Sequence, residues 1–126
     1  MSKILYYINV FIFIYVTRER MMTEFDLIAF CKALGDETRQ QILEILLAEG
    51  EKCVSDLVER FNLSQPTISH HLNFLKYANL VTSRKEGKQI YYRAEDDNIV
   101  ECCGMLYTRF VPLKLHIETE KEAAPE

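Results

Sequence analysis

The stretch that most constrains the fold is Leu63–Leu80, which reads LSQPTISHHLNFLKYANL. Ser64 is a strong candidate for a helix N-cap. Pro66 falls in the first helical turn, where its missing amide hydrogen costs no hydrogen bond. The apolar residues that follow repeat at helical spacing and predict a buried stripe of Ile68, Leu72 and Leu75. The stretch therefore predicts a short helix with a polar outward face.

Three helices are predicted before this stretch. The first starts with a capping pattern at Thr23 and stops at Gly35. The second lies between a cap at Asp36 and a closing Gly50, and the third covers Val54–Phe61. Their spacing predicts buried faces made of Phe25, Ile28, Ala29, Ile42, Leu43, Leu46, Leu47, Val54, Leu57, Val58 and Phe61.

Two strands are predicted after Leu80. LVTSRK and KQIYYR are rich in β-branched and aromatic residues, and Glu86 and Gly87 form a turn between them. The tip of this hairpin is basic, although a solvated turn would explain such a cluster if it stood alone. After a short helix, a tight turn and a helix with a polar face, the hairpin is typical of a wing. We therefore predict a mainly α fold with a β-hairpin wing, a winged helix-turn-helix.

The charge distribution agrees with this interpretation. The 126 residues carry 15 basic and 19 acidic side chains, a net charge of −4, which disfavours a nucleic-acid binder that relies on overall charge. Between Arg60 and Arg93, however, six basic residues face one acidic residue, Glu86. This asymmetry predicts one positive face on an acidic body, suited to phosphates.

A last helix is predicted from Asp96 or Asp97 to about Phe110, where Pro112 should stop it. Four residues repeat at heptad-like spacing and suit pairing with a helix of a second subunit: Ile99, Cys103, Leu106 and Phe110. Residues 112–126 are expected to form an acidic, fraying tail.

The N-terminal segment is a separate problem. Ile4–Val16 is almost wholly apolar, but thirteen residues are few for a membrane-spanning helix, and no small-residue cleavage site follows. We favour translation from Met21 or Met22, which would make residues 1–20 an extension outside a domain of residues 21–111. The alternative is a membrane anchor. With translation from either methionine, we expect a cytoplasmic protein without a membrane partner.

Three segments carry a family resemblance: ALGDETRQQILEILL, EKCVSDLVERFNLSQPTISHHLNFLKYANLV and RKEGKQIYYRA. They resemble the ArsR/SmtB family of winged-helix transcriptional repressors, and the resemblance covers roughly Glu24–Phe110. It implies a homodimer formed by the first and last helices, which binds an imperfect inverted repeat in double-stranded DNA and is released by an effector. Nothing in the residues suggests an enzyme, since the chain has no Gly-rich phosphate loop, no H-E-x-x-H and no C-x-x-C.

We predict three sets of DNA contacts. The helix would present to base edges the side chains of Gln65, Thr67, His70, His71 and Asn73. Ser64 and Ser69 suit phosphates at the helix N-terminus. Arg84, Lys85 and Lys88 would lie on the backbone or in the minor groove. An adjacent histidine pair is a poor metal site because neighbouring helical residues diverge by about 100°, so we favour DNA for both histidines.

The resemblance constrains the effector by what the chain lacks. Arsenic-sensing members carry an ELCVCDLC type of motif, and the matching stretch here is EKCVSDLV. Cys53 keeps one thiol, whereas Ser55 and Val58 replace the others, which excludes an As(III) site built wholly in that segment. The family's zinc pattern, D-x-H followed by H-x-x-[EH], is absent around Asp97 and His116.

Soft thiols remain as candidate ligands. The four cysteines show no disulfide spacing. Thiolates of Cys53, Cys102 and Cys103 would suit As(III), Cd(II), Pb(II) or Cu(I), with Cys31 across the dimer as a substitute for Cys53. The simpler interpretation makes Cys103 a small core hydrophobe with Cys102 on its flank. A thiol-redox response, or DNA binding without any effector or required cofactor, stays open.

Overall fold

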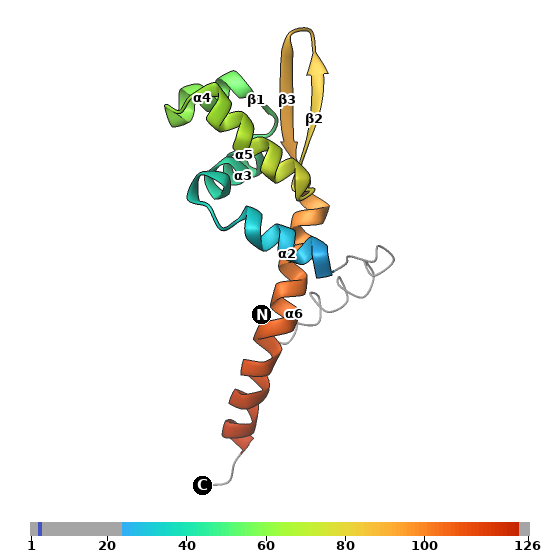
Figure 1. Ribbon diagram of the computed structural model, residues 1–126. Helices are drawn as coiled ribbons and strands as arrows, with labels where there is room; N and C mark the ends of the chain where they lie inside the picture. The colour runs from blue at the N-terminus through green and yellow to red at the C-terminus, as the bar shows by residue number, and fades with distance from the viewer. Residues whose placement is uncertain (1–2, 4–23, 124–126) are drawn as a thin grey trace.

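The computed structural model describes residue 3 and residues 24–123. Within this part, the helices and strands are α2 (Glu24–Ala33), α3 (Glu37–Glu49), β1 (Lys52–Cys53), α4 (Val54–Phe61), α5 (Gln65–Tyr77), β2 (Val81–Glu86), β3 (Gln89–Ala94) and α6 (Asp96–Ala123). Helices α3, α4 and α5 form a body from which the β2–β3 hairpin projects, while α2 lies against α6, which extends away from the body (Figure 1). The predicted winged helix-turn-helix architecture is confirmed.

Local capping fixes the ends of the helices where the sequence predicts them. The Asp36 carboxylate accepts the Arg39 backbone N–H at 3.0 Å, and the Ser64 hydroxyl accepts that of Thr67 at 3.3 Å. At the other ends, Gly50 (φ 86°) closes α3 and Asn62 (φ 52°) closes α4, both at positive φ. These caps satisfy groups that the helices leave unpaired, so the chain turns sharply between α3, α4 and α5.

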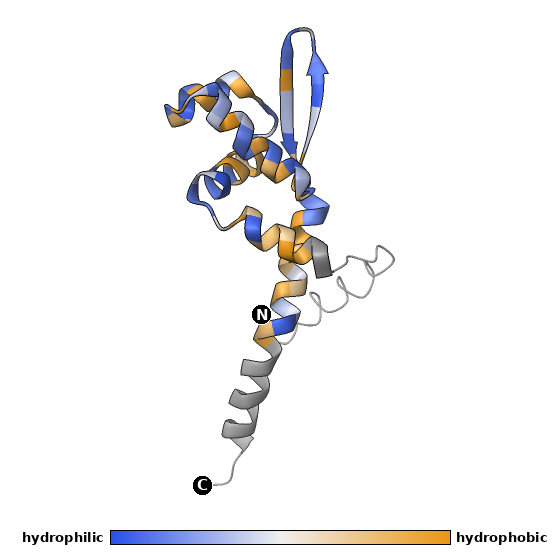
Figure 2. Ribbon diagram, viewed as in Figure 1, coloured by the Kyte–Doolittle hydropathy of each residue, from blue (hydrophilic) through white to orange (hydrophobic). Residues whose placement is uncertain are grey.

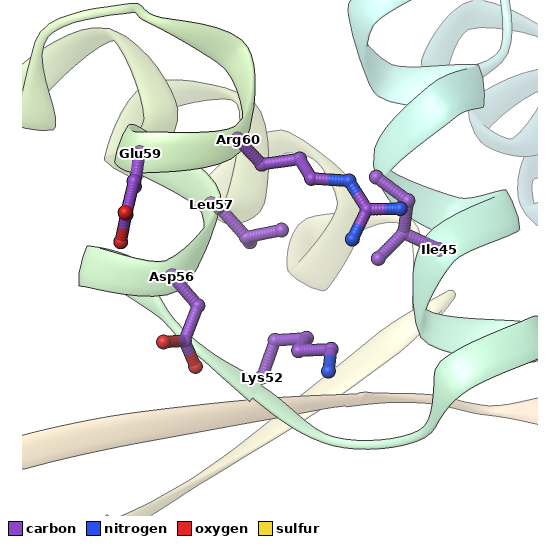
Figure 3. Close-up of a pocket in the computed structure, with 6 residues that line it drawn as sticks. All are labelled: Ile45, Lys52, Asp56, Leu57, Glu59 and Arg60. Carbon is purple, nitrogen blue, oxygen red and sulfur yellow. The ribbon is translucent and has the colours of Figure 1, made fainter.

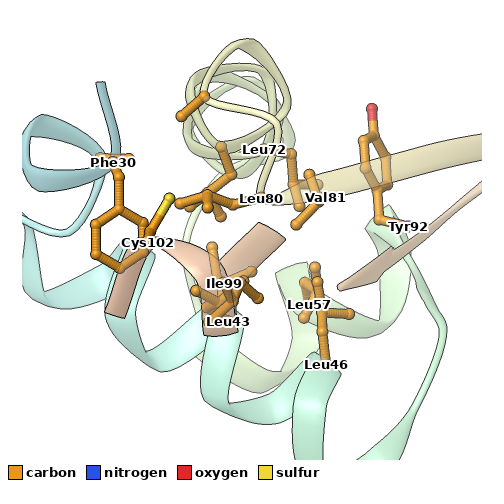
Figure 4. Close-up of a cluster of buried hydrophobic side chains, with 14 of the residues drawn as sticks. Phe30, Leu43, Leu46, Leu57, Leu72, Leu80, Val81, Tyr92, Ile99 and Cys102 are labelled. Carbon is orange, nitrogen blue, oxygen red and sulfur yellow. The ribbon is translucent and has the colours of Figure 1, made fainter. Parts of the chain in front are cut away.

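The core lies where the helical body meets the base of the sheet and the start of α6. Figure 4 shows side chains from α2, α3, α4, α5, β2 and α6 gathered in one apolar cluster. The stripe predicted for α5 is fully buried, and the cluster also includes Phe30, Leu57, Leu80, Val81 and Ile99. Figure 2 shows apolar residues where α2 and α6 meet and mostly polar residues on the hairpin.

The prediction of a buried side chain is wrong for two residues of α2 and α3. Ile28 is 49% exposed and Leu47 is 48% exposed. In α3 the covered face is narrower than predicted, since Ile42, Leu43 and Leu46 are buried as expected. In α2 the buried residues are Leu27, Phe30 and Ala33. A stripe of apolar residues wider than one contact face does not define which part of it is covered.

The sheet has one more strand than predicted. Its order is β1-β3-β2, with both pairs antiparallel. The two-residue β1 pairs Cys53 with Tyr91, and Tyr91 also faces Arg84 of β2. The hairpin turns at Gly87 (φ 61°), as predicted. Strand β1 leads directly into α4, so the sheet joins the wing to the helix-turn-helix.

Helix α6 differs from the prediction in its length and its buried face. It runs through Pro112 to Ala123, so the expected end near Phe110 is wrong. A proline removes one backbone hydrogen bond, a local loss that a 28-residue helix tolerates. Cys102 is 2% exposed and Cys103 is exposed, whereas the sequence predicted Cys103 in the buried stripe and Cys102 on its flank. Phe110 is also exposed.

Arg39 connects three helices. Its Nε donates to the Ala33 carbonyl at the end of α2 at 2.6 Å, and its Nη2 donates to the Lys32 carbonyl at 3.2 Å. The guanidinium also stacks on the Phe74 ring of α5, 4.1 Å from the centroid. One side chain of α3 therefore holds both α2 and α5.

Other predictions fall on residues 1–2 and 4–23, which lie outside the described part, including the translation start and the cap at Thr23. Among the described residues, no helix is long and apolar enough to cross a membrane.

Asp36→Ala should lower the free energy of unfolding by about 1 kcal/mol, the usual loss for an N-cap, in urea denaturation at pH 7. The Arg39 backbone N–H holds the pKa of Asp36 below its ordinary value, followed by the nearby charges of Arg39 and His71. The cap's contribution is therefore present above the ordinary carboxyl range, and it is lost as pH falls through the lowered pKa. Asp36→Asn should keep most of the stability without this acid dependence. Equal stability of wild type and Asp36→Ala would contradict the assignment.

Candidate nucleic-acid interface

Helices α4 and α5 form the helix-turn-helix. Helix α4 stops at the left-handed Asn62, and α5 starts three residues later behind the Ser64 cap. Ile68, Leu72 and Leu75 are fully buried and fix the rotation of α5 about its own axis. This rotation decides which of its polar side chains reach solvent.

Most of the predicted readers lie on the open side of α5. Gln65, Thr67, His70 and Asn73 are exposed, whereas Ser69 is half-buried. Ser64 is exposed, and its hydroxyl lies 2.7 Å from that of Thr67. The α5 segment contains no acidic residue, so its open face can approach phosphates without repulsion.

His71 differs from its predicted partners. Its side chain is 12% exposed and turns toward the start of α3, where Nδ1 lies 3.8 Å from the Asp36 carboxylate. This nitrogen is buried and has no hydrogen-bond partner. The structure therefore does not bring His71 to the open face with His70, and its assignment as a base reader is not supported by this geometry.

The basic residues of the wing differ in whether they form ion pairs within the protein. Lys85 and Lys88 are exposed at the hairpin tip. Arg84 is engaged instead, with Nε 3.0 Å from both Glu51 oxygens and Nη1 2.6 Å from Glu86. At the base of the hairpin, Arg93 donates to Thr82 at 3.1 Å. The predicted basic tip is thus reduced to two lysines open to phosphate.

Sequence reasoning missed the residues that hold these elements in place. Lys76, at the end of α5, donates to the Ser83 hydroxyl of β2 at 2.8 Å and so ties the helix to the wing. Glu51 binds Arg84 from a position 33 residues earlier in the chain. Both residues looked like ordinary surface charges in the sequence, and no short-range pattern links either one to its partner.

Comparisons with known proteins identify the family. The family model described as "Bacterial regulatory protein, arsR family" matches residues 36–83. An uncharacterized HTH-type transcriptional regulator of Methanocaldococcus jannaschii is 47% identical over 70 residues, which is 56% of this chain and 79% of that protein. The chain belongs to the ArsR family.

Two further relatives agree. The arsenical resistance operon repressor of Staphylococcus aureus is 40% identical over 86 residues, covering 66% of this chain and 82% of the repressor. The solved structure of an ArsR-like transcriptional regulator from Rhodococcus sp. RHA1 superposes with a TM-score of 0.67 at 31% identity, covering 80% of this chain and 94% of that one. Like other ArsR-family members, this protein is a DNA-binding transcriptional regulator and not an enzyme.

The thiols of this ArsR-family chain lie in different surroundings. Cys53 is buried at the start of α4, with Sγ 3.0 Å from the Ser55 hydroxyl and 3.1 Å from the Asp56 carboxylate. Hydrogen bonds from Cys53 hold the pKa of Asp56 below its ordinary value. Cys102 packs beside Phe30 in the core (Figure 4).

Cys103 lies on the flank of the buried face of α6 and not within it. Its thiol is exposed, and partial burial raises its pKa above the ordinary value. Successive helical residues point about 100° apart, which separates Cys103 from Cys102. Among the side chains that the structure describes, no three from His, Cys, Asp or Glu are grouped so that they could hold a metal. The predicted set of Cys53, Cys102 and Cys103 is therefore not assembled within one chain.

A pocket lies between α3 and α4. Figure 3 shows its six lining residues: Ile45, Lys52, Asp56, Leu57, Glu59 and Arg60. Arg60 donates to both oxygens of Glu49, at 3.0 and 2.8 Å, so an internal ion pair already occupies one wall. None of the six residues is a cysteine, and the pocket is not a thiophilic site.

The two adjacent cysteines should respond differently to substitution. Cys102→Ala removes a packed sulfur and should lower the free energy of unfolding by about 1 kcal/mol. Cys103→Ala, at an exposed position, should change it by less than about 0.5 kcal/mol. Urea denaturation at one fixed protein concentration measures both. The burial assignment would be wrong if Cys103→Ala were the more destabilised variant.

Proposed function

We propose that this ArsR-family regulator is a repressor that binds an inverted repeat in promoter DNA as a homodimer, with α5 in the major groove. The observation that carries the proposal is the exposed polar face of α5 beside a hairpin with open lysines. Gln65, Thr67, His70 and Asn73 offer hydrogen bonds to base edges. Lys85 and Lys88 supply attraction to the phosphates on the flank of the site.

The proposed dimer rests on apolar side chains that one chain leaves uncovered. Ile28 of α2 is about half exposed, and Val100 and Phe110 of α6 are exposed as well. Helices α2 and α6 lie against each other (Figure 1), so a second copy would cover both together. A two-fold axis there would present two α5 helices to half-sites about one DNA turn apart.

We propose further that a thiophilic ion releases the repressor, as the repression of an arsenical resistance operon by a relative suggests. The exposed thiols lie on the two helices assigned to the dimer, Cys31 on α2 and Cys103 on α6. As(III) or Cd(II) bound by these thiolates would act at the interface that sets the spacing of the two α5 helices. Cys53 and Cys102 are buried and take no part in this arrangement.

DNA reading is tested by selecting duplexes from a randomised library with the wild-type protein. On the selected duplex, His70→Ala and Asn73→Ala should each reduce affinity by roughly fivefold to 150-fold and relax base preference at the contacted positions. Lys85→Ala and Lys88→Ala should instead weaken all duplexes alike, and each should reduce the slope of log affinity against log salt by about 0.9.

Lys32→Ala is the matched control for charge, since Lys32 is exposed on α2, away from the α5 face and the wing. It should leave affinity and slope close to wild type. Failure to select any preferred duplex would overturn sequence-specific binding. Equal effects of the lysine and His70 variants on base preference would contradict the division of roles.

The effector is tested by following fluorescence anisotropy of the selected duplex while As(III), Cd(II) or Zn(II) is added to the reduced protein. As(III) or Cd(II) should release the DNA, whereas Zn(II) should have little effect. Cys103→Ser combined with Cys31→Ser should abolish the response, and Cys53→Ser should preserve it. An unchanged response in the Cys31 and Cys103 double variant would contradict the site. No response in the wild type would overturn the effector while leaving DNA binding intact.

A further inference from the structure

Arg84 is a basic residue of the wing that already forms ion pairs within the protein. Its Nη2 lies 2.6 Å from a Glu51 oxygen, its Nε lies 3.0 Å from both Glu51 oxygens, and Nη1 lies 2.6 Å from Glu86. Two carboxylates thus surround one guanidinium, with Arg84 and Glu86 exposed and Glu51 half-buried. This group carries a net negative charge, unlike the open Lys85 and Lys88, and is poorly suited to a phosphate.

The ion pair crosses the whole width of the sheet. Arg84 on the outer strand β2 lies opposite Tyr91 of β3, and Tyr91 lies opposite Cys53 of β1. Adjacent strands are about 4.8 Å apart, so two strand spacings separate β2 from β1. The guanidinium passes over the Tyr91 ring, 4.8 Å from its centroid, and reaches Glu51 just before β1. An arginine is long enough for this span and can bind the carboxylate with two nitrogens.

Besides the Lys76–Ser83 hydrogen bond, few polar contacts connect the wing to the helices in the described part of the chain. Strand β1 contains two residues, and beyond them the hairpin is a two-stranded ribbon. Two-stranded ribbons are marginally stable in water, and their angle to the rest of a protein is easily changed. Glu51 belongs to the short link between α3 and β1, which continues directly into α4. The ion pair therefore fixes the outer edge of the hairpin to the helix-turn-helix body.

We propose that Glu51 and Arg84 are positioning residues for DNA recognition: their ion pair across Tyr91 sets the angle of the wing, so that Lys85 and Lys88 meet the phosphates while α5 occupies the groove. This inference rests on the proposed DNA interface. It also changes the role predicted for Arg84, from a phosphate contact to a support for the lysines that make such contacts. The Arg84 hydrogen bond lowers the pKa of Glu51, so the pair stays charged at neutral pH.

The two roles for Arg84 predict opposite effects at Glu51. If Arg84 bound phosphate directly, Glu51→Gln would strengthen DNA binding, since it removes an acid and frees a cation. If the pair positions the wing, Glu51→Gln weakens binding even though it makes the surface more positive. The sign of the change therefore separates positioning from direct electrostatic contact.

The experiment measures affinity for the selected duplex with Glu51→Gln, Arg84→Gln and the exchange of the two residues, Glu51→Arg with Arg84→Glu. Each single variant should lose roughly five- to tenfold in affinity through lost preorganisation. The exchange, combined with Glu86→Gln to remove the carboxylate that would repel the new acid at position 84, should recover most of it, because the pair re-forms with reversed polarity. In a Lys85→Ala, Lys88→Ala background, Arg84→Gln should cause no further loss.

Glu49→Gln is the matched control, because Glu49 also binds an arginine, Arg60, through two nitrogens but joins α3 to α4 and makes no contact with the β2–β3 hairpin among the described hydrogen bonds. It should stay within about twofold of wild type, since an exposed pair contributes little on its own. Thermal melting of every variant should show that the fold is kept.

Three outcomes would overturn the inference: stronger binding by Glu51→Gln, no recovery in the exchanged variant, or further loss from Arg84→Gln when both lysines are absent. Failure of the wild-type protein to select any duplex would instead overturn the proposed function. The two failures are therefore distinguishable in one series of measurements.

Discussion

The direction in which the polar side chains of α5 point depends on the burial of the inner face of that helix. Ile68, Leu72 and Leu75 are fully enclosed by the helical body and the base of the sheet. Each contributes about 2 kcal/mol through the area it removes from water. A polar residue at any of these positions would rotate or release the helix, and the open face would lose its geometry even though none of its own residues had changed.

The limits of α3, α4 and α5 could be predicted from the sequence because caps act locally. Asp36, Ser64, Gly50 and Asn62 each end or begin a helix through bonds to residues three or four positions away. The buried face of a helix could not be predicted with the same certainty, because it depends on the neighbours that cover it. Ile28, Leu47 and the Cys102–Cys103 pair show this. The apolar residues of each helix are compatible with more than one buried face, and tertiary packing decides which face is covered.

The candidate site shows a similar division. The exposed residues of α5 follow from the buried stripe, since three fixed positions determine the rest of the wheel. Whether each basic residue of the wing is paired or free cannot be predicted from the local sequence, because Arg84 pairs with Glu51, which lies 33 residues away in the chain. A count of basic residues therefore overestimates the positive charge that the wing can present to phosphates. His71 likewise lies away from the open face of α5, because its side chain turns toward Asp36. The strand β1 was too short to have a signature of its own.

Arg39 has a consequence for how the molecule can move. Its guanidinium is held by two carbonyls at the end of α2 and lies flat on an aromatic ring of α5. The Arg39 side chain therefore links the end of α2 to the face of α5 that lies next to it. A shift of α2 that keeps these contacts would therefore be passed to α5 through Arg39 as well as through the direct packing of the two helices.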